Sequence, residues 1–545
     1  MAKVLGINAV FHDPSAAVVV DGHVVSAAEE ERFSRRKHGK TPLPFAAWEL
    51  PEQAARWCLQ KAGLKAEDLD AVAYSYDPRL ADPHAGDVTA DGWEALRNMY
   101  ASLAPQFLAE MLPGLDPLRV RFVRHHVAHA ASAHLAAPFK DSAVLVLDGA
   151  GEKTSHLAGL ARGGGLEILA SQALPHSLGL MYEYVTEHLG FRRSSDEYKV
   201  MAMASYGTPR FLGDLRRLIG PTGDGGFHVD HIDWAQYAPG RRSGQPIDQV
   251  HFDLAASVQV RLQEVLLSLA RWLHSHTLQS NLTMAGGVAL NCVANSYLAE
   301  QGPFRKIWVQ PAAGDAGTAL GAALFLATEL GDDVKGMSTA ALGRSWSESE
   351  IRTWLDVASV PYEESRDIAG AVARLLADNH IVAWFQGRSE FGPRALGHRS
   401  LLANPTYPEN LQRLNNVKGR EQFRPVAPMV LENHAAAIFE GPLPSPYMLF
   451  THRVRPEWRE KIAASVHVDG TARIQTISSE DEPLVAQMLE KFYGLTGIPV
   501  VINTSYNTAG RPMVDDPRDA LEAFGSAAID ALAVGPFLVK RNRTL

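Results

Sequence analysis

Apolar runs alternate with polar turns along most of the chain, and this pattern predicts a layered α/β protein. Residues 3–10 ("KVLGINAV"), 12–30 and 141–151 are typical of buried strands that end in Gly/Asp turns. Residues 51–63 and 253–278 instead carry apolar positions at helical spacing, which predicts amphipathic helices. Strands that alternate with such helices indicate sheets covered by helices.

A change in character near residues 336–344 predicts a domain boundary. The segment is polar, and beyond it residues 381–400 and 498–517 are strand-to-loop segments rich in Gly, Arg and Asn. The chain has 545 residues, which is more than one ordinary hydrophobic core holds. We therefore expect two domains, residues 1–340 and 341–545, and no tandem repeat stands out.

Composition narrows the class of protein. The net charge is −9, with 46% hydrophobic and 21% charged residues, so no positive field invites nucleic acid or an anionic membrane. No apolar run reaches the roughly 18 residues of a membrane span. The two cysteines, Cys58 and Cys292, are too few for a disulfide framework or a Cys-rich zinc site. We expect a cytoplasmic protein, with a homodimer as the default assembly.

Four histidines lie in "VRHHVAHAASAH", residues 123–134. His125 and His129 are four residues apart and share one face of a helix, whereas His126 and His134 point elsewhere. By itself the pair leaves three interpretations open: metal ligands, catalytic bases, or a helix that happens to carry imidazoles.

Four turns between strands and helices are rich in glycine or acidic residues. They are "GINAVFHDPSAA", "LVLDGAGEKTS", "AGGVALN" (residues 285–291) and "AAGDAGTALGAA" (residues 312–323). Small residues at a helix N-terminus let backbone N–H groups approach a phosphate or a flat ring. Close packing of the backbone is the alternative explanation for each turn.

The order of these turns resembles the actin-like ATPase superfamily, with two phosphate loops and a later adenosine loop. The His125-x-x-x-His129 pair resembles the metal-binding motif of its TsaD/Kae branch, which transfers threonylcarbamoyl groups from an adenylate to tRNA. Asp315 matches the aspartate that completes the metal site in that branch, and "LVLDGAGE" adds Asp148. Two imidazoles and two carboxylates suit Fe²⁺, or another divalent metal. The same resemblance assigns the adenylate, or ATP, to Gly286, Gly287 and Asn291.

Two loops of the second domain resemble YrdC-like domains, which build carbamoyl-type adenylates from ATP. "LNNVKGREQFRPVAP" and "VINTSYNTAG" match their Lys-x-Arg and Ser-x-Asn pairs; a solvated basic loop and a β-turn are the alternatives. Arginines also crowd the glycines of "GRSEFGPRALGHRS", which solvation alone does not explain. We expect carbamoyl phosphate and ATP to be bound by Lys418, Arg420, Arg473, Ser505, Asn507, Arg388 and Arg394.

A TsaD/Kae-like domain followed by a YrdC-like α/β domain is the layout of the antibiotic and Nod-factor O-carbamoyltransferases. Five segments resemble that family in order: "HDPSAA", "EEERFSRRKHG", "HHVAHAASA", "DEYKVMAMASYG" and "FQGRSEFGPRALGHRS". The family resemblance implies that carbamoyl phosphate and ATP, with Mg²⁺, form carbamoyl adenylate. The carbamoyl group would then pass to a hydroxyl of a small-molecule natural product, an antibiotic or a sugar. Lys418 and Arg420 would be catalytic in the first step.

The acceptor hydroxyl needs a base, and His12 of "FHDPSAA" is our candidate. The resemblance also makes Lys37 a candidate contact of the adenylate. The charged run around Lys37 interleaves basic residues with three glutamates, which favours a solvated surface for Arg32, Arg35, Arg36 and Lys37.

Three other functions compete with this interpretation. An actin-like sugar kinase or ATPase would release ADP, but it leaves the second domain and the histidine pair unexplained. A hydrogenase-maturation carbamoyltransferase is excluded by the two cysteines and by the reversed domain order. The charge of −9 and the lack of a basic patch argue against a tRNA-modification partner.

Overall fold

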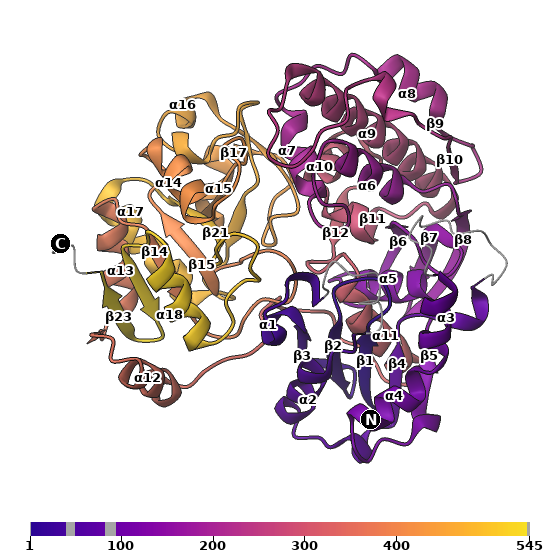
Figure 1. Ribbon diagram of the computed structural model, residues 1–545, viewed down its shortest axis with the longest axis horizontal. Coiled ribbons are helices and arrows are strands. Elements are labelled where there is room, and N and C mark those ends of the chain that lie inside the picture. The colour runs from indigo at the N-terminus through magenta and orange to yellow at the C-terminus, as the bar shows by residue number, and fades with distance from the viewer. Residues whose placement is uncertain (1, 40–48, 82–93, 542–545) are drawn as a thin grey trace. The chain divides into compact units, whose positions relative to one another are not determined.

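The computed structural model describes residues 2–39, 49–81 and 94–541. The chain divides into two compact units, Met1–Met337 and Ser338–Leu545 (Figure 1). This division falls three residues before the boundary expected from the sequence.

The first unit contains two five-stranded sheets, a two-stranded sheet and several helices, of which the longest spans Gln249–Thr277. Its strands are β1 Lys3–Asn8, β2 Ser15–Val20, β3 His23–Glu29, β4 Ala71–Tyr74, β5 Val120–Phe122, β6 Asp141–Leu147, β7 Thr154–Arg162, β8 Gly165–Ala173, β9 Ile219–Pro221, β10 Phe227–Val229, β11 Asn281–Ala285 and β12 Lys306–Val309. Its α-helices are α1 Glu31–Ser34, α2 Glu52–Lys61, α3 Glu94–Ser102, α4 Ala104–Met111, α5 His125–His134, α6 Leu178–His188, α7 Glu197–Ala204, α8 Leu212–Leu218, α9 Gln249–Thr277, α10 Cys292–Gln301 and α11 Ala316–Glu329.

Two five-stranded sheets of this unit repeat one topology. The first has the order β3-β2-β1-β4-β5, and the second has the order β8-β7-β6-β11-β12. In each sheet the first three strands of the chain pair antiparallel, and the last two then add in parallel beside the first. This duplication is the arrangement of the actin-like class. The fold class expected from the sequence, an α/β chain with an actin-like first part, is confirmed.

Helices α5 and α11 pack against each other between the two sheets. Helix α11 contacts β1 and β2 of the first sheet, and α5 contacts β6 and β11 of the second (Figure 1). Gly321 makes the close crossing possible, because a Cβ atom there would lie 1.8 Å from the carbonyl oxygen of Ala128. The crossing fixes where the N-termini of both helices lie.

The second unit is built on one large sheet. Its strands are β13 Glu363–Glu364, β14 Val382–Phe385, β15 Arg399–Ala403, β16 Ala427–Leu431, β17 Phe439–Glu440, β18 His452–Val454, β19 Thr471–Ala472, β20 Gln475–Ile477, β21 Val500–Ser505, β22 Ala531–Val534 and β23 Phe537–Lys540. Its α-helices are α12 Glu348–Val357, α13 Ile368–Ala377, α14 Glu409–Val417, α15 Glu432–Ile438, α16 Pro456–Arg459, α17 Pro483–Thr496 and α18 Pro517–Ser526.

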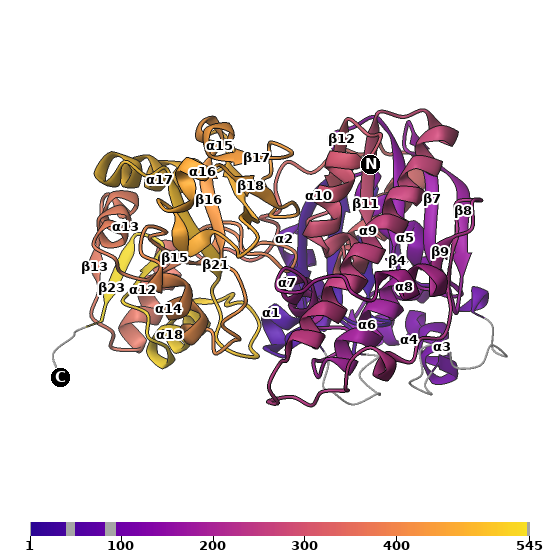
Figure 2. The same cartoon turned by 90° about the horizontal axis from the view of Figure 1, so that it is seen from above.

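Helices cover both faces of this eight-stranded sheet, whose order is β13-β23-β22-β14-β15-β21-β16-β20. Side chains of a strand alternate between faces. Ala383 and Phe385 of β14 therefore join a core with α12, α14 and α18, whereas Val382 and Trp384 join a core with α13 and α17. In Figure 2, α17 lies above the sheet and α14 and α18 lie below it. Because both faces of the sheet are covered, all four side chains of β14 are apolar and buried.

Part of the charged run at residues 29–37 is buried, although the sequence favours a solvated surface there. Glu29, Glu30 and Arg32 are 6%, 7% and 2% exposed. The Nε atom of Arg32 lies 3.5 Å from Oε2 of Glu29. Glu30 accepts hydrogen bonds from the backbone N–H groups of Gln53 and Ala54, at the start of α2. The prediction of a solvated surface is therefore wrong for Arg32, whose partner Glu29 also lies inside the fold, whereas the side chain of Arg36 is 57% exposed.

Among the described residues, no helix is both long and apolar enough to cross a lipid bilayer.

Candidate functional site

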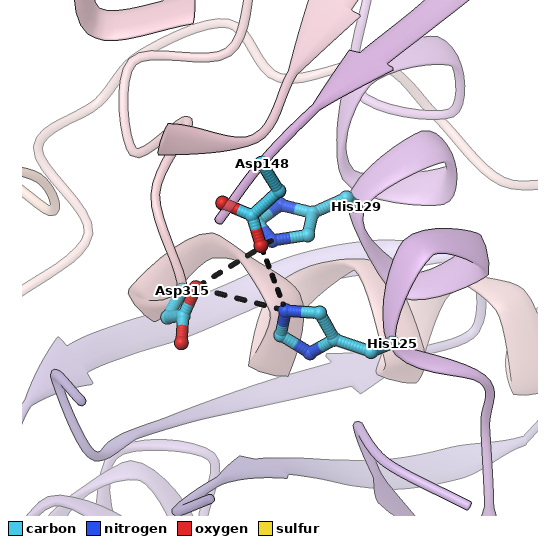
Figure 3. A group of neighbouring side chains, drawn as sticks. All are labelled: His125, His129, Asp148 and Asp315. Atoms are coloured by element: carbon cyan, nitrogen blue, oxygen red, sulfur yellow. Dashed lines mark hydrogen bonds and ion pairs between the residues drawn. The ribbon is translucent and has the colours of Figure 1, made fainter. Parts of the chain in front are cut away.

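A cluster of two histidines and two aspartates lies where α5, β6 and α11 meet. His125 and His129 come from α5, Asp148 follows β6, and Asp315 directly precedes α11 (Figure 3). Their ligand atoms lie within 4.8 Å of one another. Figure 3 shows the four side chains pointing toward a common centre.

The distances within this cluster are those of groups that face one another. Oδ2 of Asp148 lies 3.2 Å from Nε2 of His125 and 3.5 Å from Nε2 of His129. Oδ1 of Asp315 lies 3.7 Å and 3.6 Å from the same two nitrogens. None of the four residues is more than 5% exposed. The structure therefore brings together the four residues that the sequence assigned to one metal.

Backbone groups fix the orientation of two cluster residues. The carbonyl oxygen of Ser75 lies 3.2 Å from Nδ1 of His125, so it accepts that N–H and leaves Nε2 for the cluster. The backbone N–H of Gly287 donates to Oδ1 of Asp148 at 2.8 Å. These contacts hold an imidazole and a carboxylate in place before any ligand arrives.

Electrostatics inside the cluster favour opposite charges. Burial alone would lower the pKa of His125, but its hydrogen bond to Asp148 and the nearby charge of Asp315 outweigh burial and raise that pKa well above its ordinary value. For Asp148, burial raises the pKa, yet the nearby charge of His129 and the hydrogen bond with His125 hold it well below the usual range. Burial raises the pKa of Asp315 as well, but the charges of His12 and His125 hold it below its ordinary value, so both carboxylates are ionised, as metal ligands must be.

The donor set fits a metal ion. Among the described residues, the buried atoms Nδ1 and Nε2 of His129 and Oδ2 of Asp315 make no hydrogen bond. Buried polar atoms normally have a partner, because leaving one unsatisfied costs about 1–3 kcal/mol. Two imidazoles with two carboxylates are a donor set for a divalent transition metal.

The other two histidines of α5 have protein partners. His134 bonds through Nδ1 to the carbonyl oxygen of Ala130 at 2.7 Å. Nδ1 of His126 lies 2.8 Å from the hydroxyl of Thr154. Yet Nε2 of His126 is 3.9 Å from Oδ2 of Asp148, so this side chain borders the cluster more closely than its place on the helix suggests.

His12 lies beside the cluster, in the turn between β1 and β2. Its Nε2 atom is 3.8 Å from Oδ2 of Asp315, and its Nδ1 atom is 3.0 Å from Oδ2 of Asp13. The side chain of Asn8 donates to the carbonyl oxygens of His12 and Asp13, both at 2.9 Å, and holds the turn. The same turn in the second sheet, between β6 and β7, carries Asp148.

The predicted adenosine loop has structural tasks of its own. Gly286 has φ +90°, and a Cβ atom there would lie 2.1 Å from the carbonyl oxygen of Leu147. The side chain of Asn291 accepts from the N–H of Ala294, at the start of α10, and donates to Oε1 of Gln259. Close packing thus explains Gly286, and adenylate contacts of this loop and of half-buried Lys37 stay predictions.

In the second unit, Lys418 meets the predicted Ser-x-Asn pair. Lys418 ends α14 and is 7% exposed. Its Nζ atom donates to Oγ of Ser505 at 2.9 Å and to Oδ1 of Asn507 at 2.5 Å. Ser505 and Asn507 lie 87 and 89 positions after Lys418 in the chain. The three residues therefore form one polar cluster around a buried cation.

Two of the predicted anion-binding arginines have backbone or amide partners. Arg420 donates through Nε to Oδ1 of Asn415 at 2.6 Å and through Nη2 to the carbonyl oxygen of Pro425. Arg388 donates to the carbonyl oxygens of Leu342 and Gly343. Part of the arginine density thus serves the architecture, and phosphate contacts of these two residues stay predictions. Arg394 and Arg473 are half-buried, and their phosphate contacts also stay predictions.

Sequence reasoning missed Glu152, which organises the start of α5. The residue is 5% exposed, and its Oε1 atom accepts from the backbone N–H of His125 at 2.7 Å and of Asp77 at 2.9 Å. A carboxylate here satisfies a free helix N–H and complements the helix dipole. Glu152 follows Asp148 by four residues in "DGAGE", and this motif was the only available signal.

Comparison with known proteins gives the class and then the family. Residues 3–85 and 97–324 match "Carbamoyltransferase N-terminus", and residues 373–541 match "Carbamoyltransferase C-terminus". These matches cover most of both units, so the protein is a transferase. The chain belongs to the carbamoyltransferase family.

Several relatives cover nearly the whole chain. An uncharacterized protein of Synechocystis sp. is 36% identical over 99% of this chain and 97% of its own length. Nodulation protein NolNO of Sinorhizobium fredii is 37% identical over 98% of this chain and 80% of its own length. Among solved structures, HypF of T. kodakarensis is 14% identical, with a TM-score of 0.40, over 61% of this chain and 48% of its own.

Proposed function

We propose that the protein is an ATP-dependent O-carbamoyltransferase that works in two steps. The second unit makes carbamoyl adenylate from carbamoyl phosphate and ATP, and the first unit passes the carbamoyl group to a hydroxyl of a small molecule. The observation that carries this proposal is a buried, charged cluster in each unit of a carbamoyltransferase chain. A cation cluster suits phosphate chemistry, and a metal-type cluster beside a histidine suits transfer to an alcohol.

The first step needs positive charge around phosphates, because charge builds on their oxygens in the transition state. Water first hydrolyses carbamoyl phosphate: the bond between the carbamoyl group and phosphate breaks, and carbamate and inorganic phosphate form. An oxygen of carbamate then attacks the α-phosphorus of ATP, which is bound with Mg²⁺, and pyrophosphate leaves. Lys418, held by Ser505 and Asn507, supplies a fixed cation for this step. Arg420, Arg473, Arg388 and Arg394 are the further residues that we assign to these anions.

In the second step the acceptor oxygen attacks the carbamoyl carbon and AMP leaves. An alcohol is a weak nucleophile until its proton is removed, and His12 is placed to take it. His125, His129, Asp148 and Asp315 would hold the metal, for which we propose Fe²⁺. The metal would supply Lewis-acid polarisation or neutralise a phosphate. Gly286, Gly287, Asn291 and Lys37 are the residues that we assign to the adenosine part.

Product analysis tests the proposal. The full-length protein is incubated with ATP, Mg²⁺ and labelled carbamoyl phosphate, without and with a panel of hydroxylated sugars and aminoglycosides. We expect AMP and pyrophosphate in equal amounts, only when carbamoyl phosphate is present, and label in one of the acceptors. Formation of ADP independent of carbamoyl phosphate would instead identify an actin-like kinase or ATPase and overturn the proposal.

A further inference from the structure

The carboxylate of Asp13 bridges two histidines that are 26 residues apart in the chain. Its Oδ2 atom lies 3.0 Å from Nδ1 of His12, and its Oδ1 atom lies 2.9 Å from Nδ1 of His38. Nε2 of His38 lies in turn 2.9 Å from the hydroxyl of Ser195. A continuous chain of hydrogen bonds therefore runs from Ser195 to His12, whose Nε2 atom faces the buried metal-type cluster.

The backbone holds this bridge in an uncommon conformation. Asp13 has φ +51° and His38 has φ +61°, which is the left-handed region that side chains other than glycine rarely adopt. The N–H of Asp13 donates to the carbonyl oxygen of His38 at 3.2 Å. A Cβ atom on Gly39 would lie 2.6 Å from the ring of Pro14, so the two segments approach closely. Strained residues persist where the surrounding structure holds them, and they cluster at functional sites.

The charge of Asp13 decides where the protons of the two imidazoles lie. Burial raises the pKa of Asp13, but the charge of His38 and hydrogen bonds from both histidines hold it well below its ordinary value. An ionised carboxylate only accepts hydrogen bonds. Both histidines must therefore donate through Nδ1, and a neutral His12 carries its lone pair on Nε2, the nitrogen that faces Asp315 and the transfer site.

We propose that Asp13 is the positioning residue of the transfer step. It holds His12 in its Nδ1–H tautomer so that Nε2 accepts the proton of the acceptor hydroxyl, while His38 keeps the carboxylate of Asp13 in place. The inference rests on the proposed role of His12 as base. It adds a requirement that the sequence did not suggest, namely that His12 has one fixed tautomer. Oδ2 of Asp13 sets this tautomer, and Oδ1 of Asp13 is held by His38.

A fixed tautomer matters because the two nitrogens of a neutral imidazole have opposite roles. Only the nitrogen without hydrogen accepts a proton, and a base must point that nitrogen at the hydroxyl. Without Asp13 the ring of His12 exchanges tautomers and rotates. Misplacing a catalytic group by about 1 Å costs on the order of 10²-fold in rate. The contribution of Asp13 should therefore appear in kcat and not in binding of the acceptor.

The first test reads the tautomer directly and needs no acceptor. Full-length protein with ¹⁵N-labelled histidine is loaded with Zn²⁺, which is diamagnetic, and the ring signals of His12 and His38 are assigned from His12→Gln and His38→Gln. We expect both rings of the unsubstituted protein as Nδ1–H tautomers. In Asp13→Gly the His12 ring should shift to the Nε2–H form or a mixture. Glycine suits the left-handed backbone, so the fold is kept. A wild-type His12 with hydrogen on Nε2 alone would overturn the proposal.

The second test reads the rate with the acceptor that turns over in the panel above. Asp13→Gly should lower the kcat of transfer about 10²-fold, with the acceptor KM within about threefold and pyrophosphate release from ATP unchanged. Added formate, a small carboxylate, should raise the kcat of Asp13→Gly at least about tenfold. Asp13→Asn keeps one accepting oxygen and should fall between Asp13→Gly and the wild type.

Controls separate this inference from the function on which it rests. Asp21→Gly makes the same change at an exposed residue with φ +52°, outside this chain of hydrogen bonds, and should change kcat less than about threefold. Formate should not rescue His12→Asn. A full rate in Asp13→Gly, or a loss that formate does not relieve, overturns the role of Asp13. A full transfer rate in His12→Asn overturns the base assignment instead, whatever the tautomer measurement gives.

Discussion

His125 and His129 face the same two carboxylates, but only one of them has its second nitrogen engaged. Nδ1 of His125 donates to Ser75, whereas among the described residues Nδ1 of His129 has no hydrogen-bond partner. Ligand histidines are usually oriented by such an outer hydrogen bond. A bound metal would thus be the main interaction that holds the His129 ring.

His129→Ala should therefore abolish stoichiometric metal binding. We expect metal content to fall at least about tenfold, because a four-ligand site loses one donor. Elemental analysis after dialysis against a weak chelator measures it, with His134→Gln as the control on the same helix. His134 bonds to the helix backbone and lies outside the cluster, so its substitution should leave metal content unchanged. Wild-type metal content in His129→Ala would contradict the site.

Lys418 gives a second prediction at the scale of one residue. Lys418→Met keeps the volume of the side chain and removes the charge, while Ser505 and Asn507 still bond to each other at 2.8 Å. Pyrophosphate release that depends on carbamoyl phosphate should fall about 10²-fold or more, since removing one stabilising donor costs about that much. The exposed Lys461→Met is the matched control and should retain the activity. Persistence of the reaction in Lys418→Met would move adenylate formation to other residues.

Helix α2 depends on a carboxylate from outside the helix. Glu30 accepts from the N–H of Ala54 at 2.8 Å, and burial raises its pKa to about 7 from an ordinary value of 4.5. The unfolded chain therefore ionises this group at lower pH than the folded protein does. Folding stability should fall as pH rises from about 4.5 to 7, because the buried charge must then form in the folded state.

Thermal unfolding of Glu30→Gln measures this effect. Relative to the wild type, the variant should gain stability between pH 5 and pH 7.5, by about 2 kcal/mol, the order expected for a buried carboxyl shifted by two units or so. Glu67→Gln, at an exposed position, should show no such gain. Parallel pH curves for Glu30→Gln and the wild type would contradict the prediction.

Elements also show how far the sequence could predict the site. The spacing of His125 and His129, the motif around Asp148 and the turn before α11 name three contributors to the cluster, because each signal is local. Glu152 and the bridge of Asp13 to His38 depend on contacts between segments that are far apart. The spacing of apolar residues along the chain does not predict these contacts. Burial of Glu30 and Arg32 was missed for the same reason, since a charged run looks solvated until its partners are placed.

At the scale of the whole molecule, the first unit repeats a topology without repeating a sequence. Both sheets have a turn with candidate site residues between their first two strands, with His12 and Asp13 in one and Asp148 in the other. Many different sequences satisfy the apolar pattern that such strands need, so the duplicated topology leaves no tandem repeat in the chain. We assign the proposed chemistry to the residues that differ between the two turns.

Substitution of His12 tests most sharply whether the two units divide the reaction as proposed. In His12→Asn the second unit is intact, so pyrophosphate release that depends on carbamoyl phosphate should stay within about twofold of the wild type. Transfer to the acceptor should fall about 10²–10⁴-fold, which is the usual contribution of a general base. Carbamoyl adenylate should then accumulate or hydrolyse, and rapid quench with labelled carbamoyl phosphate would detect either outcome. If both half-reactions fall together, the two units do not divide the reaction as proposed. If transfer persists, another group takes the proton and the place of His12 beside Asp315 has a structural cause.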